Sequence, residues 1–209
     1  MWYREAVLCL QTPSDPSWAI EAIRDLDHVL VDHAHCEMKA ASNALSLAAR
    51  NPDNLALVRA LTDLAREEIE HFQRVLTFLE ARGLSLGTPI VDTYAAELRR
   101  AVGALPQKDA PPPIVDRLLV GAIIEARSCE RFKLLMGALS PSGEPELHAF
   151  YTELFVAEAR HYQVLIDLAI DAAGGDAARV DARLAMLSVR EGEIVRKLAK
   201  RDDRATIHG

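Results

Sequence analysis

The sequence predicts an all-α protein, and three observations indicate this class. Half of the 209 residues are hydrophobic, but aromatic residues make up only 5%. Glycine and proline are sparse, whereas alanine, leucine, glutamate and arginine, which favour helices, are abundant. Four long stretches also repeat hydrophobic residues at alternating spacings of three and four, which is the period of an amphipathic helix.

These four stretches predict long helices, and each is followed by residues that stop a helix. Asn51-Pro52-Asp53 follows the first, Gly83 follows the second, the segment SPSGEP separates the third from the fourth, and Gly174-Gly175 follows the last. The first helix is predicted to be interrupted near residues 25–27. The long helices are predicted at residues 18–50, 53–82, 112–139 and 145–173, and weaker patterns predict shorter helices at 92–103 and 178–200.

The connection lengths predict how these helices are arranged. Short turns make the first and second helices antiparallel, and likewise the third and fourth. The stretch from Gly83 to Pro111 is long enough to run back along a helix, so the second and third helices can be parallel. We therefore expect a ferritin-like four-helix bundle with one long crossover connection over residues 18–173. It would belong to a single domain, 1–209, that ends in a helical extension at 176–209.

Charge and cysteine content limit the class of protein. A net charge of −7 argues against a generally basic nucleic-acid-binding protein, although a local basic cluster, RKLAKRDDR, occurs at residues 196–204. The cysteines Cys9, Cys36 and Cys129 are far apart and form no Cys-x-x-Cys motif, which indicates neither a disulfide framework nor a rubredoxin-type iron site. With no signal peptide or membrane span expected, the sequence predicts a cytoplasmic protein.

Six polar residues interrupt the hydrophobic seams of the four long helices. In the first half of the chain a glutamate on one helix precedes a Glu-x-x-His motif on the next by 31 residues, and in the second half by 33. The two halves therefore look like copies of one helical hairpin. The six residues are Glu37, Glu68, His71, Glu125, Glu158 and His161.

Buried carboxylates need compensating charge, and a pair of divalent cations would supply it. The four glutamates carry about four negative charges, which two such ions would balance. The i, i+3 spacing also places each Glu-x-x-His pair on one helix face. An oxygen-rich site with one nitrogen per metal suits iron or manganese better than zinc, and iron is the first choice. The competing interpretation is that the six residues form buried ion pairs or lie on an exposed helix face.

Other polar residues near the seams are assigned different roles. Glu130 is the second choice for the third-helix carboxylate, because it falls one position past the core residue Cys129, which could line a cavity. His33 is predicted to be a hydrogen-bonded core histidine rather than a ligand, in a position from which it could support one. The arginines expected to face solvent or to pair with neighbouring acids are Arg66, Arg127 and Arg160. The histidines expected on the surface are His28, His35, His148 and His208.

Four segments resemble one known family more specifically than the six polar residues do. They are DHAHCEMKAA (residues 32–41), EEIEHF (67–72), IIEARSCERF (123–132) and EARHY (158–162). Together they resemble the bacterial tRNA hydroxylase family MiaE, which acts on 2-methylthio-N6-isopentenyladenosine. The likeness runs from about residue 18 to the C-terminal helix.

This resemblance implies a non-haem di-iron monooxygenase that hydroxylates the isopentenyl side chain of the modified adenosine beside the anticodon. It implies tRNA as substrate, O2 and two electrons as co-substrates, and an external reductase or electron-transfer protein as a partner. The six polar residues named above would hold the two iron ions, with no departure from the family pattern. An apolar pocket for the side chain could form where the seam residues are small, as at Ala40 and Ala122.

The surface that binds RNA is predicted from positive charge, because a nucleotide brought into the protein needs its phosphates held. The candidates are Arg196, Lys197, Lys200 and Arg201, with Arg99 and Arg100 behind them. The alternative is a solvated helix end without function. Two other functions compete with hydroxylation. One is iron storage in a large shell, and the other is peroxide removal by a di-metal peroxidase or a manganese catalase.

Overall fold

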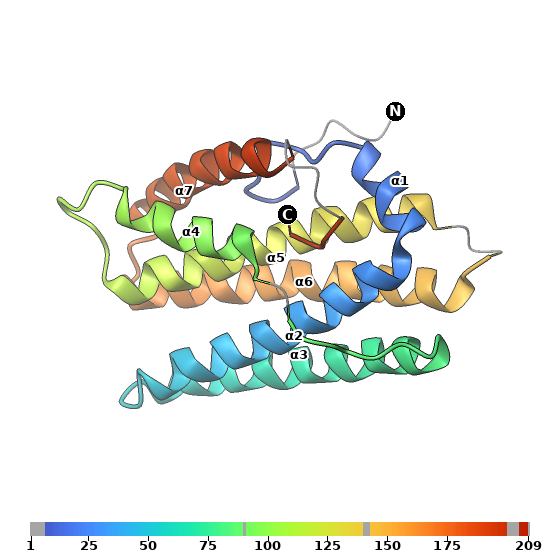
Figure 1. Cartoon of the computed structure of the whole chain (residues 1–209). Coiled ribbons are helices and arrows are strands. Elements are labelled where there is room, and N and C mark those ends of the chain that lie inside the picture. The colour runs from blue at the N-terminus through green and yellow to red at the C-terminus, as the bar shows by residue number, and fades with distance from the viewer. Residues whose placement is uncertain (1–6, 90, 140–142, 200–204, 209) are drawn as a thin grey trace. The chain divides into compact units, whose positions relative to one another are not determined.

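The computed structural model describes residues 7–89, 91–139, 143–199 and 205–208 (Figure 1). Within these ranges it contains helices and no strands, which confirms the predicted all-α class. Each predicted helix is present, with ends that differ from the prediction by a few residues. The helices are α1 (Ser17–Arg24), α2 (Leu26–Ala49), α3 (Leu55–Ala81), α4 (Thr93–Gly103), α5 (Pro113–Ala138), α6 (Pro145–Ala172) and α7 (Ala177–Leu198).

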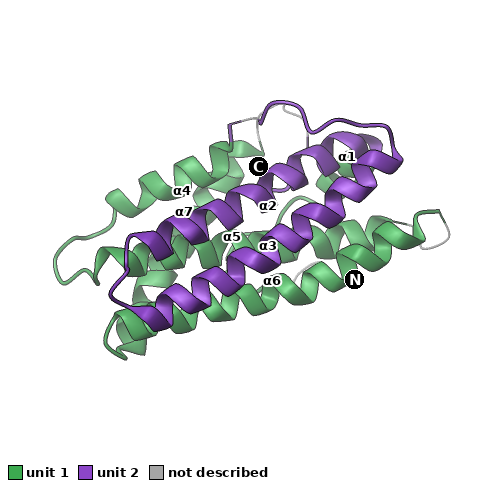
Figure 2. Cartoon of the chain, turned by 90° about the horizontal axis from the view of Figure 1, so that it is seen from below, with its two compact units in different colours: residues 1–23, 92–204, 208–209 green, residues 24–91, 205–207 purple. Residues whose placement is uncertain are grey.

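The chain divides into two compact units, which Figure 2 colours separately. Unit 1 comprises residues 1–23, 92–204 and 208–209, and therefore contains α4 to α7 and nearly all of α1. Unit 2 comprises residues 24–91 and 205–207, and contains α2 and α3. The single domain expected from the sequence stays a prediction.

Unit 2 is a helical hairpin in which α2 and α3 pack along each other. The predicted interruption of the first helix is confirmed, because the backbone of Asp25 leaves the helical region (φ −123°, ψ 47°) and separates α1 from α2. Gly83 ends α3 as predicted. Its φ of 68° is favourable for glycine alone among common residues, and it lets Leu84 N–H donate to the carbonyl oxygen of Leu79 at 2.9 Å.

The start of α3 gives a first test of local stability. The Asn54 side chain accepts a hydrogen bond from Leu57 N–H at 3.1 Å, and this caps the helix. We expect Asn54→Ala to lower the free energy of unfolding by about 1 kcal/mol, because one helix-end N–H loses its partner. Urea unfolding followed by circular dichroism measures the change. Asp53→Ala, at an exposed neighbouring position, is the control; an equal loss there would contradict a capping role for Asn54.

Unit 1 is built on a second hairpin, α5 with α6, and α4 and α7 pack beside it. Pro113 and Pro145 stand in the first turns of α5 and α6, where a missing N–H costs no helical hydrogen bond. The two helices approach closely at Gly121, where a Cβ atom would lie 3.2 Å from a methyl carbon of Leu165. The predicted C-terminal helix, α7, contacts α4, α5 and α6 within this unit.

A buried charged network holds α7 to α5 and to the N-terminal segment. The Arg127 side chain is fully buried; its Nε–H donates to Glu191 at 2.9 Å, and its Nη1–H donates to Glu130 and to the Ser14 hydroxyl. Tyr94 of α4 also donates to Glu191, at 3.0 Å. The prediction that Arg127 faces solvent or pairs with acids is therefore wrong for solvent and right for acids. Arg66 and Arg160 are exposed, as expected.

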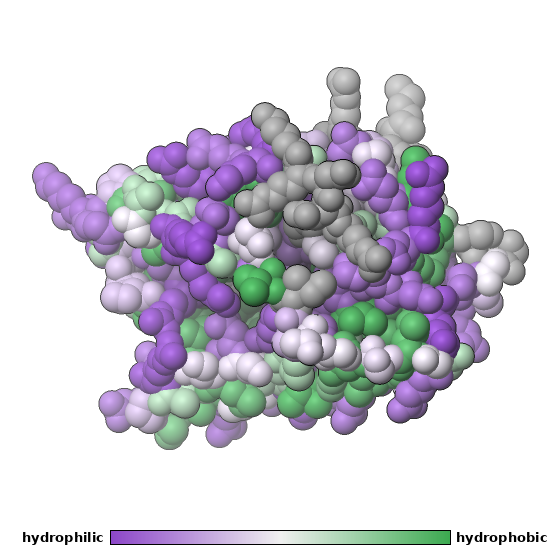
Figure 3. Space-filling model, viewed as in Figure 1, coloured by the Kyte–Doolittle hydropathy of each residue, from purple (hydrophilic) through white to green (hydrophobic). Residues whose placement is uncertain are grey.

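Hydrophilic side chains cover most of the face in Figure 3, with hydrophobic ones interspersed. Across the described part of the chain, every helix is too short or too polar to cross a membrane.

Candidate metal centre

Unit 2 brings three of the six predicted ligands together. Glu37 lies in the middle of α2, and Glu68 and His71 lie one turn apart on α3. The Nδ1 atom of His71 is 3.5 Å from Glu37 Oε2 and 3.6 Å from Glu68 Oε2. One ligand atom from each residue lies within 4.8 Å of the others, which is close enough for a single metal ion to reach all three.

Unit 1 repeats this arrangement with the other three residues. Glu125 lies near the middle of α5, and Glu158 and His161 lie one turn apart on α6. His161 Nδ1 is 3.2 Å from Glu158 Oε2, and the potential ligand atoms of the three residues again lie within 4.8 Å of one another. Each unit therefore presents a cluster of two carboxylates and one imidazole.

The chemistry of both clusters suits a metal ion. All six residues are buried, and none is more than 8% exposed. Carboxylates this deep are costly unless positive charge compensates them. The competing interpretation of exposed residues on misphased helices is thus wrong. Oxygen donors with one imidazole nitrogen per cluster match iron or manganese, whereas structural zinc prefers tetrahedral sites rich in sulfur or nitrogen.

Two polar residues near the clusters, Glu130 and His33, make hydrogen bonds within the core. Glu130 accepts hydrogen bonds from the Ser14 backbone N–H at 2.7 Å and from the Ser14 hydroxyl at 2.6 Å, in addition to its bond with Arg127. This engagement leaves Glu125 as the better ligand candidate on α5. His33 is fully buried, and its Nε2 lies 2.6 Å from Glu37 Oε1, as expected of a hydrogen-bonded core histidine.

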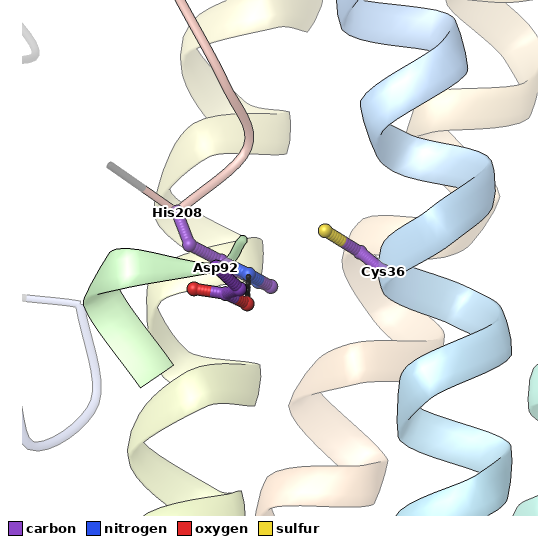
Figure 4. A group of neighbouring side chains, drawn as sticks. All are labelled: Cys36, Asp92 and His208. Atoms are coloured by element: carbon purple, nitrogen blue, oxygen red, sulfur yellow. Dashed lines mark ion pairs between the residues drawn. The ribbon is translucent and has the colours of Figure 1, made fainter. Parts of the chain in front are cut away.

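The surface assignment is wrong for two histidines. His35 is buried in unit 2, where its Nε2 donates to the Leu86 carbonyl at 3.0 Å. His208 is buried in unit 1, where it pairs with Asp92 (Figure 4). Its Nδ1 lies 3.6 Å from Asp92 Oδ2, and its Nε2 lies 3.0 Å from the Ser128 hydroxyl. Both depend on segments distant in sequence, and helix periodicity carries no signal for such contacts. The other two, His28 and His148, are half-buried.

Cys129 lies on the seam of α5, one turn from Glu125 of the unit 1 cluster. Its thiol is buried and donates to the Phe155 carbonyl at 3.6 Å. Burial first, and then the negative charge of Glu158, raise the pKa of Cys129 to about 12. The sequence's suggestion that Cys129 lines a cavity stays a prediction.

This raised pKa predicts low reactivity of the native thiol. We expect Cys129 to resist iodoacetamide at pH 8.5, because the thiolate is the nucleophile and the native fold disfavours it. The unfolded chain, whose thiol titrates near its ordinary pKa, should be labelled at all three cysteines. Stability should accordingly fall as pH rises above about 9, since only the unfolded state then loses this proton. Peptide mass mapping reads the labelling, and rapid native labelling of Cys129 would contradict the assignment.

The basic candidates for RNA contact are exposed where the structure describes them. Arg196 and Lys197 lie at the end of α7, and Arg99 and Arg100 lie on α4, which packs against α7. Glu97 offsets part of this charge, because it pairs with Arg100 at 2.8 Å and lies 3.6 Å from Lys197. The last two candidates, Lys200 and Arg201, lie outside the described residues.

The helical fold and the two buried carboxylate–histidine clusters define a ferritin-like protein with sites suited to metal. A solved structure titled "Protein 43 with aldehyde deformylating oxygenase activity from Synechococcus" is 34% identical to this chain, with a TM-score of 0.84. The match covers 97% of this chain and 96% of the chain in that structure. A family model described as tRNA-(MS[2]IO[6]A)-hydroxylase (MiaE) matches residues 3–208. The chain belongs to this family.

Two curated relatives carry the name tRNA 2-(methylsulfanyl)-N(6)-isopentenyladenosine(37) hydroxylase. The protein from Pseudomonas putida is 41% identical over 186 residues, which cover 89% of this chain and 86% of the relative. The protein from Salmonella typhimurium is 28% identical over a gapped alignment of 235 positions, which spans 89% of this chain and 83% of the relative. The family resemblance drawn from four short segments is thereby confirmed.

Proposed function

We propose that this chain is a tRNA hydroxylase that acts on the isopentenyl side chain of 2-methylthio-N6-isopentenyladenosine. The observation that carries the proposal is the family match over residues 3–208, together with the names of the two curated relatives. The fold class and the buried carboxylate–histidine clusters support an oxidative reaction of this kind. A tRNA substrate is consistent with an enzyme that acts in the cytoplasm.

The metal in this proposal is a pair of iron ions, with manganese as the less favoured alternative. The six buried carboxylate and histidine residues of the two clusters are the proposed ligands of these ions. Four carboxylates would balance two divalent ions, and this accounts for burying so much negative charge. When bound, such a pair supplies the chemistry that activates O2 for attack on a C–H bond. One oxygen atom enters that bond, the other leaves as water, and an external donor supplies two electrons.

The protein's own side chains would position the metal and exclude water from it. The clusters are buried among the apolar seam residues of α2, α3, α5 and α6, and small residues there could admit an isopentenyl group. Ala122 is fully buried and Ala40 half-buried, so replacing either by leucine would test whether they shape such a pocket.

The decisive assay uses the iron-loaded chain with hypomodified tRNA, O2 and a chemical reductant. Nucleoside mass analysis should find one added oxygen on the isopentenyl group, and tRNA lacking that group should remain unchanged. The solved relative named for aldehyde deformylating oxygenase activity favours a second candidate substrate, an aldehyde. Turnover of aldehyde without any oxidation of tRNA would therefore refute the proposed substrate.

The basic residues of α4 and α7 are proposed to hold tRNA phosphates. We expect Arg196→Glu combined with Lys197→Glu to weaken tRNA binding, and the slope of log affinity against log salt to fall by roughly one to two units. Fluorescence anisotropy across a salt series measures both. The matched control is Arg66→Glu on α3, an exposed arginine that pairs with Glu70. An unchanged salt slope in the double variant would show that the cluster is only a solvated surface.

A further inference from the structure

His33 stands out among the groups that the proposed ligand set does not use. It lies on α2 one turn before Glu37, and its side chain is fully buried. A leucine at this seam position would cost nothing in burial, whereas a buried imidazole is costly unless it is hydrogen-bonded. The Nε2 atom of His33 lies 2.6 Å from Glu37 Oε1, which is a short and well-defined contact.

The two oxygens of the Glu37 carboxylate have different neighbours. Oε1 faces His33, whereas Oε2 faces the imidazole of His71 at 3.5 Å. A carboxylate that binds a metal ion can only accept hydrogen bonds, so in the proposed centre the Nε2 atom of His33 would be the donor of this bond. With that nitrogen occupied as a donor, its lone pair is not free for a metal ion. His33 thus holds one oxygen and leaves the other directed toward the cluster.

We propose that His33 is a positioning residue that orients Glu37 so that Oε2, and not Oε1, binds the metal ion. The proposal rests on the metal centre assigned under the proposed function. A hydrogen bond from behind reduces the freedom of a ligating carboxylate, and the loss of such a partner typically weakens metal affinity about 10- to 100-fold. His33 would therefore act through Glu37 and touch neither metal nor substrate.

The chain offers a matched control on the same helix. His35 is also buried, and its Nε2 also donates one hydrogen bond, but the acceptor is the Leu86 carbonyl and not a proposed ligand. Replacing either histidine removes a buried hydrogen bond and should lower stability. Only the replacement of His33 should change metal binding.

The test is anaerobic titration of the metal-free full chain with Co²⁺, read by its visible absorption and by calorimetry. We expect two equivalents to bind to the wild-type chain. In His33→Leu, one of them should bind about 10- to 100-fold more weakly with an altered absorption band. His33→Gln keeps an N–H donor on a side chain of similar volume, and it should recover most of the affinity. His35→Leu should bind both ions with wild-type affinity.

Three results would overturn the role of His33. If His33→Leu and His33→Gln both bind two Co²⁺ ions as tightly as the wild type and lose only thermal stability, the hydrogen bond is merely structural. If both variants lose one equivalent outright, His33 is a ligand itself. If the wild-type chain binds no Co²⁺, the proposed metal centre fails and the role of His33 fails with it, a result distinct from the first two.

Discussion

Replacing Glu158 with alanine is expected to lower tRNA hydroxylation at least ~100-fold, equivalent to about 2.7 kcal/mol of transition-state stabilisation. Glu158 is buried, and its carboxylate lies 3.2 Å from the ring of His161 in the unit 1 cluster. The substitution removes one proposed ligand and one of the four negative charges that would balance the metal ions. Glu68→Ala should have the same effect through the unit 2 cluster. Turnover and metal content by elemental analysis measure the two losses.

A loss of activity through unfolding is separable from a loss through the metal. Without metal, four buried carboxylates disfavour the folded state, so the metal-free Glu158→Ala chain should unfold at the same temperature as the wild type or higher. Glu70→Ala is the control, because Glu70 is exposed on α3 only two residues from Glu68. Retention of two metal ions and full turnover by Glu158→Ala would exclude this residue as a ligand.

The second large effect concerns Arg127, whose replacement by methionine should lower the free energy of unfolding by about 3–5 kcal/mol. Burial by itself would lower the pKa of Arg127, but Glu191 and Glu130 outweigh it and raise that pKa above its ordinary value. Methionine would leave both carboxylates buried without their cation. For a chain of this size, the melting temperature should fall by roughly 10 °C. Thermal and urea unfolding at neutral pH measure the loss.

The pH dependence of this variant follows from Glu191. Burial already raises the pKa of Glu191, while Arg127 opposes the rise, so the variant should raise it further. A carboxyl group whose pKa is raised in the folded state binds its proton more tightly there than in the unfolded chain. The free energy of unfolding therefore increases as the pH falls from above the folded-state pKa toward the pKa of the unfolded chain. The deficit of Arg127→Met should thus be smaller at pH 5 than at pH 8.

Arg131 provides the matched comparison for Arg127, four residues further along α5. Arg131 is also buried and stacks on the Trp18 ring at 4.2 Å, but its Nε and Nη1 have no hydrogen-bond partner among the residues that the structure describes. Removing a buried cation that is poorly paired costs little, so Arg131→Met should change the free energy of unfolding by less than about 1 kcal/mol or stabilise the fold. Equal destabilisation by both variants would show that side-chain volume, not charge pairing, determines the loss.

The helices and the six candidate ligands could be predicted because both follow local rules. Periodic hydrophobic residues dictate a helix wherever they occur, and stop signals such as Gly83 act within a few residues. The same periodicity identified Glu68 and His71 as core residues, because they occupy positions that leucine or valine fills elsewhere on α3. The interruption before α2 was also predicted near residues 25–27, and it falls at Asp25.

By itself, then, the sequence determined the helical class, the order of the helices, the family and the six polar residues in the seams, since each of these depends on spacing along one chain. Only the tertiary structure decided which acids Arg127 pairs with, that His35 and His208 are buried, and which oxygen of Glu37 faces His33. Most of these contacts join residues distant in the sequence, since Arg127 and Glu191 are 64 positions apart and Ser128 and His208 are 80 apart. His33 and Glu37 are only four positions apart, but the spacing does not say which carboxylate oxygen the histidine meets. Because one helix has several faces, periodicity separates core from surface but does not say which partner a buried polar group will meet.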